Sequence, residues 1–107
     1  MQKFVFIFRR GRRGLTEEEQ AHRTNEVRTW VALQQKDSRN LDPRILVDDS
    51  DQVGDGAHVA NGNGKLIALN FIEAENFDEA VKIAKTHPGL HYGVSIEVRP
   101  WLDPRAR

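Results

Sequence analysis

The chain has 107 residues, 38% of them hydrophobic and 30% charged, a composition that suits one globular domain and excludes a disordered chain or two separate cores. Its sixteen basic and sixteen acidic residues cancel, so no overall positive field exists to attract nucleic acid or an anionic membrane. It contains no cysteine, which excludes disulfides and thiolate chemistry, and we therefore expect a soluble protein of the cytoplasm.

The first 36 residues predict a strand followed by a helix. Residues 4–8 are aromatic or β-branched and run into an Arg/Gly-rich turn, which predicts a central strand covered on both faces; the run is too short for a signal peptide or a membrane span. Thr16 precedes three glutamates, and Thr16 and Glu19 can cap each other's backbone amides at a helix start. A helix ending near Lys36 is then indicated by a stripe at i, i+3, i+4 and i+7, formed by Val27, Trp30, Val31 and Gln34.

The middle of the chain predicts two further strands. Residues 44–47 follow Pro43, and a proline at a strand entry is typical of an edge position. Residues 48–64 are rich in Asp, Asn and Gly, and the turn signal at 61–64 favours a hairpin with Val59 near one arm. Residues 65–73 are too continuously apolar for a one-sided strand and predict a second central strand.

The C-terminal part repeats the order of helix and strand. Asn76 and Glu79 repeat the capping pattern before a short amphipathic helix, which must stop before Pro88. Residues 94–98 then alternate apolar and polar side chains, which predicts a strand with one dry face. We assign residues 1–102 to a single domain and residues 103–107 to a polar tail.

The resulting order is strand, helix, strand, strand, helix, strand. This split βαβ pattern predicts an α+β fold of the ferredoxin-like kind, an antiparallel four-stranded sheet with both helices on one face. The other face of the sheet needs a cover, and a chain of this length has little core to spare. We therefore expect a homodimer.

Several segments of the C-terminal half resemble the YCII-related family. They are Phe71-Ile72-Glu73-Ala74, Asp78-Glu79-Ala80, the Pro88 stop, and Gly93-Val94-Ser95-Ile96-Glu97-Val98-Arg99-Pro100. The likeness covers residues 65–101, and the N-terminal half matches by element order. The resemblance implies a dimeric α+β barrel, in which two sheets face each other and clefts lie between sheet and helices. Members of the family are mostly uncharacterised, and some resemble lyase-type enzymes such as dehydrochlorinases.

Several members of that family carry a His on the first helix paired with an Asp after the second. At the second position, where Asp-Pro is common, this chain has His87-Pro88. The family's His on the first helix aligns near residues 27–29 of this chain, and His22 lies more than one helical turn before them. The family string Asp-Gly-Pro-Phe is present only as Asp55-Gly56.

The four histidines are the side chains that titrate near neutrality, so general acid/base chemistry would use one of them. We take His22 and His87 as the catalytic candidates. The competing interpretations are an exposed helix residue for His22, and for His87 a charged cap on the carbonyls of a helix end.

Four arginines precede the first helix, and their guanidinium groups could converge with helix amides on a carboxylate or phosphate. We take Arg9 and Arg10 as ligand-binding candidates, against the alternative of a solvated loop neutralised by residues 17–19. Trp30 is a third candidate, since it could line an apolar pocket in a barrel cleft, although a core position is the commoner role of such a residue.

The sequence favours neither a metal nor a cofactor. Pro88 and Gly89 interrupt the spacing of His87 and His91, and the acidic loop from Asp49 lacks the calcium ligand pattern.

Residues 65–73 lack the aromatic string of RNA-binding sheets, so we expect no nucleic-acid partner. We also expect no membrane partner. The first hypothesis is a small-molecule protein of the YCII-related kind, lyase-like, with a cleft between sheet and helices. The alternative is a non-catalytic dimeric module that binds a small ligand or has a regulatory role, so the sequence leaves open whether the chain is an enzyme.

Overall fold

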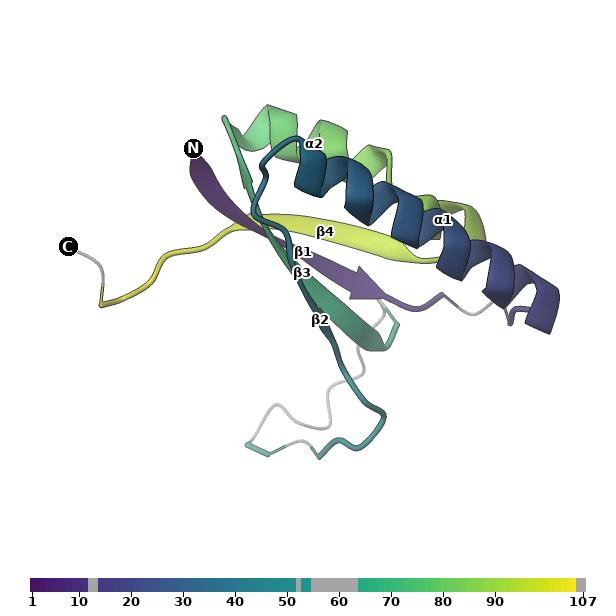
Figure 1. The fold of residues 1–107 in the computed structure, drawn as a ribbon. Coiled ribbons are helices and arrows are strands. Elements are labelled where there is room, and N and C mark those ends of the chain that lie inside the picture. Colours follow the sequence, from purple (N-terminus) through teal and green to yellow (C-terminus); the bar gives the residue numbers. More distant parts are fainter. Residues whose placement is uncertain (12–13, 52, 55–63, 106–107) are drawn as a thin grey trace.

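The computed structural model describes residues 1–11, 14–51, 53–54 and 64–105. In chain order its elements are β1 (Gln2–Arg9), α1 (Glu17–Lys36), β2 (Asp42–Ile45), β3 (Leu66–Ala74), α2 (Phe77–Lys85), a short 3₁₀ helix η1 (Pro88–Tyr92) and β4 (Ser95–Pro100). The strands form one sheet in the order β2-β3-β1-β4, with every neighbouring pair antiparallel. Both helices lie on one face of that sheet (Figure 1), which confirms the predicted α+β, ferredoxin-like arrangement.

Alternation along β1 decides which side chains face the helices. Phe4, Phe6 and Phe8 are buried on the helix face, and Val5 and Ile7 point to the opposite face, where they are half-buried. Within one chain the helices cover only the helix face of β1, and on the opposite side the ring of Trp101 packs against Phe71 of the neighbouring strand β3. We call the opposite side, which carries Val5 and Ile7, the open face.

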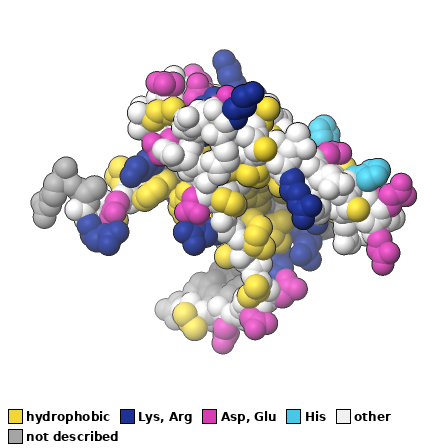
Figure 2. Space-filling view, in the orientation of Figure 1, with side chains coloured by type: hydrophobic (Ala, Val, Ile, Leu, Met, Phe, Trp, Pro, Cys, Tyr) yellow, Lys and Arg dark blue, Asp and Glu magenta, His cyan; other side chains and the backbone are white. Residues whose placement is uncertain are grey.

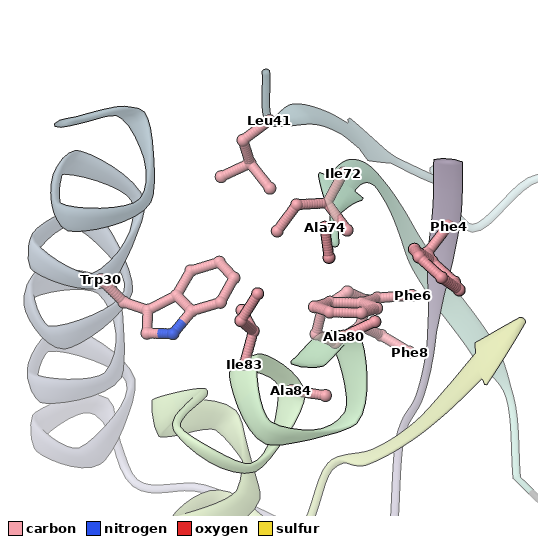
Figure 3. Packing of buried hydrophobic residues seen from close by; sticks show 10 residues of the cluster. All are labelled: Phe4, Phe6, Phe8, Trp30, Leu41, Ile72, Ala74, Ala80, Ile83 and Ala84. Atoms are coloured by element: carbon pink, nitrogen blue, oxygen red, sulfur yellow. The ribbon is translucent and has the colours of Figure 1, made fainter. Parts of the chain in front are cut away.

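The core is a single cluster between the sheet and α2, closed at one side by the C-terminal half of α1 (Figure 3). Its residues come from β1, β3, both helices and the connection before β2, and are Phe4, Phe6, Phe8, Trp30, Leu41, Ile72, Ala74, Ala80, Ile83 and Ala84. Small alanines on α2 let that helix lie close to the phenylalanines of β1, which is why the core is dense beneath α2.

The helix starts are those that the sequence predicted. The Thr16 hydroxyl accepts a hydrogen bond from the Glu19 amide, and the Glu19 carboxylate accepts one from the Thr16 amide, both at 3.1 Å. The Asn76 side chain accepts from the Glu79 amide at 2.8 Å. The predicted end of the first helix at Lys36 is also confirmed.

Two segments differ from expectation. The edge strand β2 begins at Asp42 and ends at Ile45, so Val47, which is largely exposed, lies beyond its end. After α2 the chain does not simply stop at Pro88. It turns into η1, which His87 caps at its start and Gly93 closes with a φ of 84°.

The predicted hairpin turn at 61–64 lies outside the described residues except for Gly64. This residue has a φ of +82°, and a Cβ atom there would collide with the carbonyl oxygen of Arg10. Glycine is therefore required where the start of β3 approaches the end of β1. None of the helices in the described part of the chain is both long and apolar enough to cross a bilayer.

Candidate functional site

A cleft of about 420 Å³ lies between α1 and the sheet. It exists because α1 packs chiefly against η1, and only Trp30 and Gln34 of its twenty residues are buried. The rest of the helix therefore stands away from the strands. Figure 2 shows hydrophobic side chains gathered beside Lys and Arg side chains in the middle of this side of the molecule.

The walls of the cleft are apolar and its mouth is basic. The walls are formed by the side chains of Phe8, Val27, Val31, Pro43, Ile45, Leu46, Ile67, Ala68 and Val94. Arg10, Arg23, Arg28 and Thr24 also line it, and these side chains are exposed or half-exposed. They therefore lie where the cleft meets solvent, and guanidinium groups at such a position attract anions.

His87 contributes a buried imidazole to the cleft and is 6% exposed. Its ring packs against Phe8 at 4.8 Å and Trp30 at 4.7 Å between centroids. Burial lowers the pKa of His87 from 6.5 to about 4, so the side chain is neutral at pH 7. The Nδ1 atom accepts a hydrogen bond from the Gly89 amide at 2.9 Å, which places the single ring proton on Nε2.

This arrangement makes His87 a hydrogen-bond donor. Its Nε2–H has no partner among the described residues, and the ring lines the cleft. A general base would need Nε2 unprotonated, and the proton would then sit on Nδ1 against the Gly89 amide. At pH 7 a pKa of about 4 leaves roughly one molecule in a thousand with the cationic imidazole that a strong general acid needs.

Asn70 is the second buried polar residue of the cleft and is also 6% exposed. It lies in β3 between Phe6 of β1 and Pro43 of β2, on the helix face of the sheet. Its Oδ1 atom is fully buried and has no hydrogen-bond partner in the described part of the chain. Such a group costs a fold about 1–3 kcal/mol, and an apolar residue at this position would avoid that cost.

The structure brings only some of the predicted site residues together. His87 and Arg10 both line the cleft. Arg9 lies on the open face and forms an ion pair with Glu97 at 2.7 Å. His22 is an exposed residue of the first turns of α1 and is not among the residues that line the cleft.

Trp30 stands behind His87, with the edge of its indole against the imidazole, and its Nε1–H donates to the Thr86 hydroxyl at 2.8 Å. It lines a groove between α1 and α2 on the far side of that ring. Its contact with the cleft is therefore indirect, through the position of His87. The interpretation of His87 as a charged cap is corrected, because the buried ring is neutral and accepts an amide hydrogen bond at the start of η1.

Sequence reasoning missed Asn70 and the basic residues on α1. Asn70 is the one polar residue between Leu66 and Ile72, which was a usable signal. Thr24 and Arg28 fall on the same helical stripe as Val27 and Val31. The stripe at i, i+3, i+4 and i+7 therefore marks the side of α1 that faces the cleft, and not only the part of the helix that is buried in the core.

The ion pair between Arg39 and Glu79, at 2.8 Å, has a structural role. The pKa of Glu79 lies below its ordinary value, first because its carboxylate accepts the Glu75 amide and then because of Arg39. These contacts fasten the segment after α1 to the start of α2. In the described part of the chain, no three His, Cys, Asp or Glu side chains come together as ligands for a metal ion.

In comparisons with known proteins, no family model and no curated protein sequence matches the chain. What the cleft can bind therefore follows from its own side chains.

Proposed function

We propose that this chain is a small-ligand-binding protein of the YCII-related kind, and that the cleft between α1 and the sheet holds a small organic anion with an apolar body. The observation that carries this proposal is the composition of the cleft. Its walls are apolar, its mouth carries Arg10, Arg23 and Arg28, and two buried polar side chains line it, His87 and Asn70. The Oδ1 atom of Asn70 has no hydrogen-bond partner among the described residues. A concave apolar site with a few converging polar groups is the usual form of a small-molecule pocket.

Binding is favoured over catalysis by the state of His87. The imidazole is neutral, and its Nδ1 is engaged by the Gly89 amide, so it is suited to donating a hydrogen bond to a ligand. A lyase-like enzyme is the second candidate, because His87 occupies the place of the family's Asp and lines the cleft. In that case a substrate would have to displace the Gly89 amide to free the ring for proton transfer.

Isothermal titration calorimetry with 2-naphthoate and its neutral analogue 2-naphthamide tests the proposed function. We expect the anion to bind more tightly than the amide, because the mouth of the cleft is cationic. Arg28→Gln should weaken 2-naphthoate binding by up to about fivefold, the scale of one exposed charge interaction. The matched control is Arg99→Gln, which removes an exposed arginine of β4 outside the cleft. This variant should bind 2-naphthoate as tightly as wild type does.

Failure of 2-naphthoate to bind at millimolar concentration would refute the proposed function. So would equal weakening by Arg28→Gln and Arg99→Gln, because the charge effect would then not belong to the cleft.

We further propose that the open face of the sheet is covered by a second copy of this chain. Its centre carries Val5, Ile7, Leu69 and Phe71, which are half-buried in a single chain. The same face also carries charged residues of both signs, which are Lys3, Arg9, Asp42, Arg44, Glu73, Glu97 and Arg99. A face that holds an apolar centre and charges of both signs can be complementary to itself, as a two-fold dimer requires.

Sedimentation velocity tests this dimer. We expect wild type to sediment as a dimer, and Ile7→Arg as a monomer because a buried unpaired charge would sit at the centre of the interface. Leu33→Arg is the control, since Leu33 is exposed on α1 in the helix layer. A monomeric wild type at tens of micromolar (about 50 μM, a concentration at which micromolar affinities are saturated) would refute the dimer.

A further inference from the structure

We propose that the two buried polar side chains of the cleft form a hydroxyl-binding subsite, so that the ligand is a hydroxy-substituted organic carboxylate. This inference rests on the proposed function, because it assigns the carboxylate to the arginines at the mouth. The hydroxyl oxygen accepts a hydrogen bond from Nε2–H of His87, and the hydroxyl proton is donated to Oδ1 of Asn70.

Asn70 supplies the first half of the argument. Its position in the centre of β3, on the helix face, is one where neighbouring residues such as Ile72 and Ala74 are apolar. Its Oδ1 atom is out of reach of solvent and of every described hydrogen-bond donor. A group that serves this oxygen must therefore enter deep into the cleft, turn the Asn70 side chain towards itself, and carry a proton to donate.

His87 supplies the second half. Its Nδ1 is occupied by the Gly89 amide, so the direction of its remaining bond is fixed: Nε2 donates. A tilted contact with Phe8 and an edge-type contact with Trp30 fix the plane of the ring. The cleft thus offers one oriented donor and one acceptor from two different elements, η1's cap and β3.

Few ligand groups satisfy both. A carbonyl can accept from His87 but leaves the Asn70 oxygen unserved. An ammonium group can donate to Asn70 but has nothing to accept the His87 proton, and the arginines repel it. A hydroxyl donates and accepts through a single oxygen atom, which makes it the smallest organic group that can serve both partners.

Calorimetry with matched pairs of probes tests the subsite: 6-hydroxy-2-naphthoate against 2-naphthoate, and 4-hydroxybenzoate against benzoate. In wild type we expect the hydroxyl to tighten binding roughly tenfold in at least one pair, the scale of two net hydrogen bonds. Asn70→Leu, which keeps the volume of the side chain, should bind the hydroxylated and the unsubstituted probe of each pair equally tightly. The control Asn25→Leu, at an exposed position of α1, should keep it.

The outcomes separate the two proposals. Equal binding of hydroxylated and unsubstituted probes by wild type overturns the hydroxyl subsite and leaves the anion-binding cleft standing. Binding of no probe overturns both. A preference that persists in Asn70→Leu overturns the role of Asn70.

An NMR measurement on wild type tests the same subsite without the Asn70→Leu variant, so the test does not depend on whether that variant folds. The side-chain ¹⁵N–¹H₂ signals of Asn70 should shift with 6-hydroxy-2-naphthoate well beyond any shift with 2-naphthoate, and equal shifts with both would overturn the subsite.

Discussion

Lowering the pH should destabilise this protein through His87 in particular. The pKa of the buried imidazole is about 4 against an ordinary value of 6.5, because burial penalises the charged form. Between these two pH values the unfolded chain binds a proton that the native protein does not bind. The free energy of unfolding therefore falls as the pH drops from 6.5 towards 4. Above pH 6.5 the imidazole is neutral in both states, so His87 contributes no pH dependence to stability there.

The expected loss follows from the difference between the two pKa values. At about 1.4 kcal/mol per pH unit, it amounts to about 3 kcal/mol by pH 4. That is a large part of the stability of a domain of this size, which is about 5–15 kcal/mol.

His87→Asn isolates the effect. Asn can still accept a hydrogen bond from the Gly89 amide at the start of η1, but it does not titrate. The variant should be less stable than wild type near pH 7, because it loses the ring contacts with Phe8 and Trp30. Urea unfolding followed by tryptophan fluorescence, at steps from pH 7.5 to pH 4, measures both proteins.

The advantage of wild type over His87→Asn should shrink by about 3 kcal/mol over that range, because the carboxylates titrate alike in both proteins and cancel in the difference. Parallel stability curves would refute the burial of a neutral imidazole in this position.

Three further substitutions test the fold in the same urea assay. Thr16→Ala should cost about 1 kcal/mol by removing the cap of α1, and an unchanged midpoint would contradict the capping box. Gly64→Ala should cost about 1–3 kcal/mol because of its positive φ, while Gly14→Ala, with open space around it, should be close to neutral; equal effects would contradict the close approach. Trp30→Phe should cost about 1 kcal/mol through the lost bond to Thr86, and a gain in stability would show that this bond contributes nothing.

Most of the fold could be predicted because its signals are local. Capping residues, apolar periodicity and turn residues lie within a few positions of each other, and they placed α1, α2 and the central strands. The 3₁₀ helix η1 could not be predicted in this way. It depends on the burial of His87 between Phe8 and Trp30, which are remote from it in sequence.

The site was harder to predict, for a related reason. Arg9 and Arg10 are neighbours in the sequence, yet the strand sends Arg9 to the open face beside Glu97, and Arg10 lines the cleft. Because side chains alternate along a strand and Phe4, Phe6 and Phe8 face the helices, Arg9 is expected on the face opposite to that of Arg10. Reading the segment as a strand covered on both faces concealed it. The cleft itself results from the way α1 packs on η1, and no local pattern in the sequence encodes that spacing.

The most direct test of the account is where an organic anion binds. A ¹H–¹⁵N titration of the wild-type chain with 6-hydroxy-2-naphthoate maps the contact residue by residue. The cleft predicts shifts of the backbone amides of Val31, Asn70 and Gly89, together with the side-chain amide of Asn70. Shifts confined to Leu33 and to other residues of the groove between α1 and α2, or no shifts at all, would contradict it.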